Sequence, residues 1–451
     1  MTKNKKKKAT ECEWMSYVKV DSITNTKLEK FRFDPAHGRT PHMRDSGSII
    51  HSSQFRRMSY KTQVYSLPEI DYPRTRLPHT IEVAQIGRQI TRAIYEKINL
   101  TDVQVRMNFE DLVYAACLAH DIGHPPFGHM GAKLLEKLTG EATNNQYTFD
   151  DNKQVVRLLM GSTVRDSFGV TAGLVDSVIK KKWDSSKHCY ESERDRVVKI
   201  IDTITKTGLK RNPACYVMEV ADDIAYLCSD IEDAIWLKIL DQKDLKEWLS
   251  HIPYVDDLYC TTDKSIFEII VSNDSFFEQP SKIAGKLIKP LIKHAIEGLC
   301  KKITKKTKID ELPEVWNDFI LSHQAKSEPY NFLYWTGPSN IGIKGESLAA
   351  MKDGVYKQKI LKSEAVAQQS IMAEKVVGDL WEALLPLANR DGYKKEFIFN
   401  LIPPYVQKKI ENFHKESLKS KETGAQMVAD YISGMTDRYA IKFWEKLYNP
   451  K

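Results

Sequence analysis

The chain has 451 residues, of which 42% are apolar, 28% charged and 10% aromatic. This is the composition of an ordinary globular protein, so it excludes a disordered, collagen-like or coiled-coil chain. No stretch approaches the about 20 consecutive apolar residues that a membrane-spanning helix needs, so no membrane partner is expected. Lysine and arginine outnumber aspartate and glutamate by 67 to 60, which gives a net charge of +7.

Helical periodicity dominates most of the chain. One apolar face recurs over 78–98, and the helix that follows stops at 123–126, Gly-His-Pro-Pro, because proline cannot continue a helix. Asn212 and Pro213 are typical of the N-cap and the first residue of another helix. Further helices are expected at two places, about 364–388 and about 424–447. We therefore predict a mostly α fold with few short strands.

Composition and periodicity divide the chain into four parts. Residues 1–45 are basic, polar and irregular, and residues 46–240 form a helical core. Residues 241–360 have weaker periodicity and more proline, glycine and lysine, which indicates an insertion or a partner-contact region. Residues 361–451 form a second helical part.

The amino terminus and the cysteines favour a cytoplasmic protein. Five lysines fall within the first eight residues, without the apolar segment of a secretory signal. The seven cysteines are spread along the chain and form no Cys-x-x-Cys pair. This pattern argues against a disulfide framework and against a thiolate zinc site.

Basic residues gather at two places, the first eight residues and the run 301–308. One interpretation is a patch that binds single-stranded nucleic acid or another polyanion. The other is a solvated tail and a solvated loop, which is the more common origin of such runs. No nucleic-acid-binding motif accompanies either run, so both interpretations stay open.

Two histidines and two aspartates have the pattern of a metal site. His120 and Asp121 are adjacent at a helix end and offer two unlike donors to one point, and His79 lies on the preceding helix. Asp222 lies in an otherwise apolar helix, where an isolated buried carboxylate is costly unless it has a partner or a metal. One such histidine alone would more simply be a hydrogen-bonded core residue. The four together predict a mixed nitrogen and oxygen site for a divalent metal.

Five segments in a fixed order carry a resemblance to a known family. They are residues 49–64, residues 74–83, the HDIGHPPFGH run at 120–129, MEVADDIAY at 218–226 and DYISGMTD at 430–437. Together with the two histidines and two aspartates above, they match the H…HD…D pattern of HD-domain phosphohydrolases. Within that family the chain resembles the bacterial deoxyguanosinetriphosphate triphosphohydrolases and the vertebrate HD-domain dNTPase related to them.

This resemblance implies a fold, an activity and an assembly. The fold would be a helical HD core over 46–240 that the C-terminal part, 361–451, completes. The activity would be metal-dependent hydrolysis of a deoxynucleoside triphosphate, with dGTP expected, to the deoxynucleoside and intact triphosphate. The metal would be Mg²⁺ or Mn²⁺, with Fe²⁺, Co²⁺ or Zn²⁺ as alternatives. Members of this branch form homo-oligomers such as hexamers, so a homo-oligomer is expected here.

Two basic side chains are expected to contact the phosphates. Arg76, three residues before His79, would reach them as a fork-shaped donor. Lys180 resembles the family's phosphate-binding lysine. It begins a run of three lysines, and a solvated helix end is an equally good interpretation of that run.

Three more side chains are expected at the sugar. Asp222, Tyr226 and Asp230 are spaced four residues apart, so they lie on one helix face. In the family, the positions that match Tyr226 and Asp230 face the sugar, and Gln63 matches a residue near it. A tyrosine under the ribose leaves no room for a 2′-hydroxyl, so such a site would select deoxyribose.

The residues expected to move protons include a departure from the family. His129 is the expected proton donor to the leaving 5′-oxygen, with His124 holding phosphate or sharing that role. Three residues after His129 the family has an acidic residue that orients this histidine, and this chain has Ala132. An unpaired imidazole loses its fixed tautomer, so Ala132 is expected to weaken the activity unless another group replaces the carboxylate.

The loss at position 132 has three explanations. One is a substitute carboxylate, for which Asp150, Asp151 and Glu136 are candidates. The others are an engineered substitution and a naturally weak enzyme. Asp150 is the carboxylate expected at the site, because the stretch 149–154, FDDNKQ, resembles the family's F-E-x-N-x-Q.

Two alternatives to the triphosphohydrolase stay open. An HD phosphodiesterase or nuclease acting on nucleic acid would suit the basic segments, but not the sugar-facing side chains or the DYISGMTD run. A nucleotide-binding regulator whose catalysis is silenced at Ala132 is the second alternative.

Overall fold

The computed structural model describes most of the helical part of the chain. The described residues are 18–19, 29–30, 38–65, 72–161, 168–180, 188–204, 211–249, 280–300, 304–305, 359–388, 395–416 and 423–448. The lysine-rich first eight residues, most of the basic run 301–308 and most of the segment 241–360 lie outside them.

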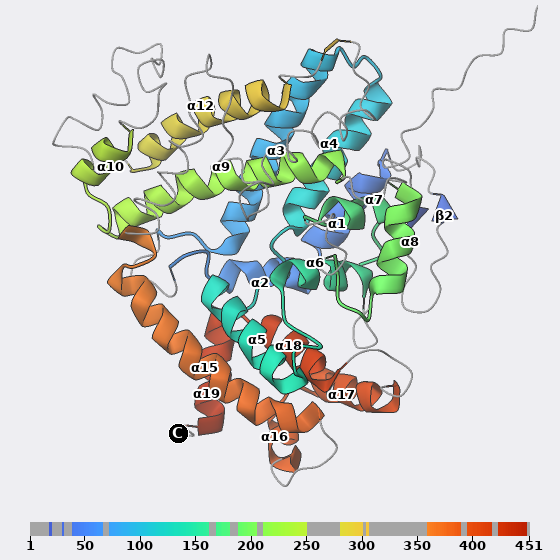
Figure 1. The fold of residues 1–451 in the computed structure, drawn as a ribbon, viewed down its shortest axis with the longest axis vertical. Coiled ribbons are helices and arrows are strands. Elements are labelled where there is room, and N and C mark those ends of the chain that lie inside the picture. Colours follow the sequence, from blue (N-terminus) through green and yellow to red (C-terminus); the bar gives the residue numbers. More distant parts are fainter. Residues whose placement is uncertain are drawn as a thin grey trace, which may run out of the picture.

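Three helices form the centre of the fold, α3 (Arg76–Ile98), α4 (Val103–Ala119) and α9 (Pro213–Trp236). Each packs against the other two, and their apolar faces make the main core (Figure 1). Asn212 caps α9 with its side chain and Pro213 follows as the first helical residue, as the sequence predicts. Two further helices, α1 (Pro41–Ile50) and α12 (Pro280–Cys300), lie against this centre.

Shorter helices surround the centre and connect its parts. They are α2 (Ser53–Arg57), the 3₁₀ helix η2 (Met58–Tyr60), α5 (Gly128–Thr143), α6 (Asp151–Met160), α7 (Ala172–Ser177), α8 (Arg194–Ile204) and α10 (Gln242–Leu249).

The C-terminal helices build a second core at one end of the molecule (Figure 1). They are α15 (Glu364–Ala388), α16 (Lys395–Leu401), α17 (Pro404–Glu416), α18 (Gly424–Ser433) and α19 (Asp437–Tyr448). Helix α5 packs against α15 and α18, so it joins the second core to the loop that precedes it.

The prediction of a single helix near 424–447 is wrong in one respect, because the structure has two helices there. Helix α18 ends at Ser433, with Gly434 as its C-cap, and α19 starts at Asp437. The backbone N–H of Tyr439 donates to the Thr436 side chain, which supports this new start. The break matters because it turns Asp437 toward the centre of the molecule.

The mostly α prediction is confirmed. The described strands are two residues each, β1 (Val18–Lys19) and β2 (Glu29–Lys30), paired antiparallel. None of the described helices is long and apolar enough to cross a membrane.

Candidate active site

The structure brings the four predicted metal ligands together at the centre of the fold. His79 comes from α3, His120 and Asp121 follow the end of α4, and Asp222 comes from α9. Nε2 of His79 lies 3.0 Å from Oδ1 of Asp222, and Nε2 of His120 lies 3.4 Å from the same oxygen. Nε2 of His120 is also 3.5 Å from Oδ1 of Asp121. The packing of three helices therefore makes one cluster from distant positions.

The surroundings of His120 fit a bound cation. Nδ1 of this ring is 2.6 Å from the carbonyl oxygen of Cys117, so its N–H donates there. In the neutral ring, Nε2 then presents a lone pair to the carboxylate oxygens of Asp121 and Asp222. A divalent metal between them would accept electron pairs from all of these atoms. A metal-binding histidine commonly donates its other N–H to a backbone carbonyl, as His120 does here.

Both aspartates of the cluster stay ionised. Burial alone would raise the pKa of Asp121, but His120, Arg76 and His124 hold it well below its usual value. Burial opposes the ionised form of Asp222 as well, and His120, His79 and Lys180 hold its pKa low. Two carboxylates with two imidazoles form a donor set suited to a dication.

The two predicted phosphate contacts lie beside this cluster. Nη1 of Arg76 donates to Oδ2 of Asp121 at 2.6 Å, and Arg76 is only 2% exposed. Its Nε and Nη2 atoms find no hydrogen-bond partner among the described residues. Nζ of Lys180 lies 3.8 Å from Oδ2 of Asp222, so this lysine faces the cluster.

A pair of histidines continues the site away from the metal ligands. The rings of His124 and His129 pack edge to face with centroids 5.4 Å apart. Nε2 of His124 lies 2.8 Å from Oδ2 of Asp151 and 3.3 Å from Oδ1 of Asp121. His124 is buried and His129 is exposed.

The two histidines have opposite pKa shifts. Burial and the charge of Arg76 would lower the pKa of His124, but Asp151 and Asp121 raise it overall. The surrounding protein, followed by the charges of His124 and Arg76, lowers the pKa of His129 to about 4. At neutral pH His129 is thus neutral before any anion binds.

The structure separates the three candidates for a substitute carboxylate. Asp150 is the N-cap of α6, and its side chain accepts the backbone N–H groups of Asn152 and Lys153 at 2.9 and 3.0 Å. Glu136 is exposed on α5. The carboxylate beside the histidine pair is therefore Asp151 and not the expected Asp150. The N-cap preference of aspartate before an apolar run was a sequence signal for this arrangement.

The predicted sugar contacts lie along α9 and the segment before α3. Tyr226 is partly buried, while Asp230 is 1% and Gln63 is 7% exposed. Tyr65 was not predicted, yet burial and then the negative charge of Asp230 raise its pKa, so it lies within electrostatic reach of this face. Its hydroxyl has no hydrogen-bond partner in the described part of the chain.

The C-terminal helices hold the loop that carries the histidines. Nζ of Lys61 donates to the carbonyl oxygens of His124 at 2.5 Å and Ser433 at 2.7 Å. The Asp437 carboxylate accepts the backbone N–H groups of Thr62 and Phe127, both at 2.9 Å, and the hydroxyl of Thr62. Phe127 has a φ of 62°, a left-handed conformation that costs a non-glycine residue roughly 1–2 kcal/mol. Asp437 thus fixes a strained turn from a distant part of the chain.

A second buried network joins α6 to α18. Asp430 accepts from Nε2 of Gln154 at 2.7 Å and from Nε of Arg157 at 2.9 Å. Nη1 of Arg157 also donates to Glu193 at 2.5 Å. Through this network the helix that begins with Asp151 is anchored to the C-terminal part.

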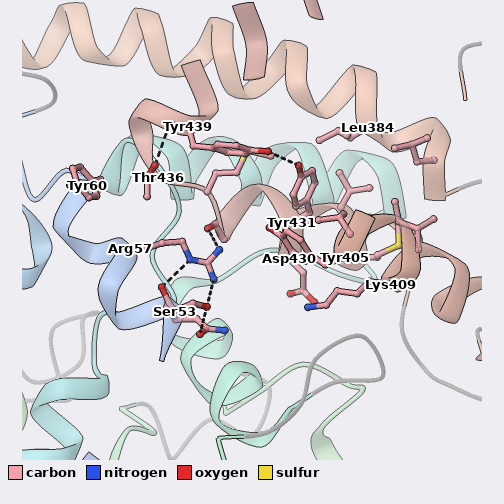
Figure 2. Close-up of a pocket in the computed structure, with 18 of the residues that line it drawn as sticks. Ser53, Arg57, Tyr60, Leu384, Tyr405, Lys409, Asp430, Tyr431, Thr436 and Tyr439 are labelled. Atoms are coloured by element: carbon pink, nitrogen blue, oxygen red, sulfur yellow. Dashed lines mark hydrogen bonds between the residues drawn. The ribbon is translucent and has the colours of Figure 1, made fainter. Parts of the chain in front are cut away.

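A cavity of about 680 Å³ lies between α2 and the C-terminal helices, with Asp430 among the residues that line it. Figure 2 shows Arg57 and several tyrosines around it, including Tyr431 and Tyr439, whose hydroxyls are 3.3 Å apart. Nη1 of Arg57 donates to the carbonyl oxygen of Gly434, which closes one wall. None of the predicted site residues lines this cavity.

Comparison with known families agrees with the geometry of the site. Residues 76–206 match the family model of the HD domain, and residues 345–446 match that of the phosphohydrolase-associated domain. The chain is an HD-domain protein. These two matches indicate a phosphohydrolase.

The HD-domain protein is similar to curated proteins along nearly its whole length. It is 27% identical to the deoxyguanosinetriphosphate triphosphohydrolase-like protein of Shewanella sediminis, over 92% of this chain and 93% of that protein. It is 28% identical to the protein of the same name from Rickettsia canadensis, over 90% of this chain and 92% of that protein.

The matched ranges divide the candidate site of this HD-domain protein. Three of the four clustered ligands fall within 76–206, but Asp222 lies beyond it. Asp430 and Asp437 fall within the phosphohydrolase-associated match. The bonds from Asp437 to Phe127 and from Asp430 to Gln154 and Arg157 therefore join the two matched parts, whereas Lys61 and Thr62 lie before residue 76.

Proposed function

We propose that this HD-domain protein hydrolyses a deoxynucleoside triphosphate, with dGTP as the first substrate to test. A water molecule attacks the α-phosphorus, the bond from phosphorus to the 5′-oxygen breaks, and the 5′-oxygen takes up a proton. The products are a deoxynucleoside and inorganic triphosphate. The observation that carries the proposal is the convergence of His79, His120, Asp121 and Asp222 with two cationic side chains beside them.

The charged groups suit a triphosphate. His79, His120, Asp121 and Asp222 would hold a divalent metal, which when bound polarises a phosphate oxygen and lowers the pKa of water. A triphosphate carries about four negative charges, so its binding needs fixed cations. Arg76 offers two buried nitrogens that lack hydrogen-bond partners among the described residues, and Lys180 adds a second cation near the cluster.

The histidine pair suits protonation of the leaving group. A deoxynucleoside leaves as a 5′-alkoxide, which is a poor leaving group without a proton donor. His129 is exposed and within ring contact of His124, so it is the better placed of the two to meet a substrate oxygen. Binding of an anionic substrate would raise the pKa of His129 from its low value and favour the protonated form.

The face of α9 supports a preference for deoxyribose. Tyr226 and Asp230 follow Asp222 at intervals of one helical turn, and Gln63 has a buried side-chain oxygen with no partner among the described residues. Tyr226 would close the space that a 2′-hydroxyl needs, and Asp230 would accept the 3′-hydroxyl. A buried carboxylate that pairs with the 3′-hydroxyl would reject a substrate that lacks this hydroxyl.

Further properties of the protein belong to the same proposal. We propose Mg²⁺ or Mn²⁺ as the metal, with Fe²⁺, Co²⁺ and Zn²⁺ as alternatives, and a cytoplasmic homo-oligomer such as a hexamer. Elemental analysis of the purified protein and light scattering test the metal and the assembly. Binding of single-stranded nucleic acid through the basic segments is tested with and without the first eight residues.

The deciding experiment is a substrate panel with identification of products. The protein is incubated with each of four dNTPs and four NTPs in the presence of Mg²⁺ or Mn²⁺. We expect inorganic triphosphate and a deoxynucleoside, and no turnover after Asp222→Ala. Release of pyrophosphate, cleavage of an oligonucleotide, or no turnover by the unaltered protein would each contradict the proposal.

A further inference from the structure

We infer that Asp151 replaces the carboxylate that the family has at position 132, and that it acts on the histidine pair through His124. This inference rests on the proposed function, because it assigns a positioning residue to the same site. Asp151 does not need to touch the substrate for this role.

The contact between Asp151 and His124 is direct. Oδ2 of Asp151 lies 2.8 Å from Nε2 of His124, and the Asp151 side chain is 24% exposed. The same nitrogen lies 3.3 Å from Oδ1 of Asp121. Two carboxylates at one ring nitrogen fix the proton on Nε2 and fix the plane of the ring. His129 packs on that ring edge to face, so the orientation of His124 determines where His129 lies.

The backbone explains how α6 comes so close to the histidine loop. At Gly123, a Cβ atom would lie 2.3 Å from the carbonyl oxygen of Asp151 and 2.7 Å from the nitrogen of Val155. Only glycine permits this approach without a shift of the helix. Asp150 caps the first turn, so the direction of the next side chain is set by the helix itself. The position of Asp151 is therefore built into the backbone.

Position 132, in contrast to position 151, has apolar surroundings. Ala132 is partly buried and packs against the C-terminal core, where α5 meets α15. A carboxylate there would lose water without a described partner to compensate, which is costly. This chain thus has a methyl group at 132, and the acid beside the histidine pair lies on α6.

A purely structural role for Asp151 is the competing explanation, because an acidic residue in the first turn of a helix stabilises it through the helix dipole. That role predicts a change in stability alone. A positioning role predicts a lower kcat with nearly unchanged KM and thermal stability. The two explanations therefore give different results for the same variants.

The experiment compares Asp151→Asn and Asp151→Glu in the full chain with Mn²⁺ and dGTP. Loss of a residue that orients a functional histidine typically costs about 10–100-fold, so we expect that fall in kcat for Asp151→Asn. Asp151→Glu should recover part of it, and metal content by elemental analysis should stay unchanged. Asp195→Asn, which removes the same group from the first turn of α8, is the matched control.

Two further variants test whether Asp151 replaces the carboxylate at position 132. Asparagine caps helices about as well as aspartate, so Asp150→Asn should lose much less activity than Asp151→Asn. Ala132→Glu in the Asp151→Asn background should not restore kcat. Restoration there, equal losses at 150 and 151, or loss of metal from Asp151→Asn would each overturn the inference.

A measurement that does not depend on turnover separates this inference from the proposed function. Long-range proton–nitrogen NMR spectra of histidine-labelled protein report which ring nitrogen of His124 carries hydrogen. We expect Nε2–H in the unaltered protein and a mixed population in Asp151→Asn but not in Asp195→Asn. An unchanged His124 spectrum in Asp151→Asn refutes the positioning role, even if no substrate is turned over. An inactive protein with the expected spectra refutes only the proposed function.

Discussion

The cluster around His120 and the tyrosine-lined cavity are two regions with opposite chemistry. In the cluster, two buried histidines, the buried Asp121 and the partly buried Asp222 face one another at 3.0–3.5 Å. The cavity has room for a ligand of about 680 Å³, but its aromatic walls are open to solvent, with Tyr60 and Tyr405 60% and 59% exposed. A cavity with room for a ligand therefore does not by itself mark the place where the charged groups converge.

The difference shows that buried charge is a better guide to the functional site of this protein than an open cavity is. Burial of charge is costly, so a fold retains it only where the charges compensate one another or hold a ligand. An exposed aromatic wall has no such cost and imposes little geometry. Variants in the two regions should therefore differ sharply in their effects on turnover.

The largest effect is expected from the predicted metal ligands. His120→Ala or Asp121→Ala removes a donor and leaves the remaining charges without compensation. We expect loss of bound metal and at least a 1,000-fold fall in turnover, about 4 kcal/mol in the barrier. Elemental analysis and triphosphate release measure both quantities. Full metal occupancy in either variant would show that the cluster is not the metal site.

A smaller but clear effect is expected at Asp437, which is remote from the metal ligands in sequence. Asp437→Ala leaves the N–H groups of Thr62 and Phe127 unpaired and releases the strained turn. We expect a loss of about 2–4 kcal/mol in the free energy of unfolding and a fall in kcat of at least tenfold. Urea unfolding and turnover are compared with Arg438→Ala, an exposed neighbour. If Asp437→Ala has the stability and the kcat of the unaltered protein, the hydrogen bonds of Asp437 are dispensable.

A change of specificity rather than of rate is expected at Tyr226. Tyr226→Ala opens space next to the sugar, so the ratio of dGTP to GTP turnover should fall about tenfold. The measurement is kcat/KM for both nucleotides. If the ratio stays the same, Tyr226 does not face the 2′-carbon.

The smallest effect is expected in the cavity. Tyr405→Ala removes an exposed ring from its wall, and substitutions at exposed positions usually change stability by about 0.5 kcal/mol or less. If the barrier to the reaction changes by no more than this, kcat changes by less than about twofold. A fall as large as that of Asp437→Ala would show that the cavity and the site are coupled.

Local sequence rules accounted for the helices and for the side chains that meet in the cluster around His120. The apolar face of α3 and the Asn212–Pro213 start of α9 are properties of short segments, so a single sequence reveals them. The H…HD…D residues followed, because they lie on or next to those helices. The packing of three helices then brings them together.

Other features depend on the exact start of a helix or on contacts between residues that are far apart in the sequence. Asp150 and Asp151 differ by one residue, and only the exact start of α6 decides which carboxylate caps the helix and which faces His124. The break between α18 and α19 was missed because the apolar pattern continues through it. The partners of Lys61 are 63 and 372 positions away, which no local pattern encodes.

The tie from Asp437 to Phe127 has a consequence for biosynthesis. The two residues are 310 positions apart in the chain. At about 5–20 residues per second, the ribosome adds Asp437 roughly 15–60 seconds after Phe127. A growing chain thus contains all four clustered ligands well before it contains the group that fixes the histidine loop. Completion of the C-terminal helices therefore sets the moment at which a newly made molecule first acquires its finished loop.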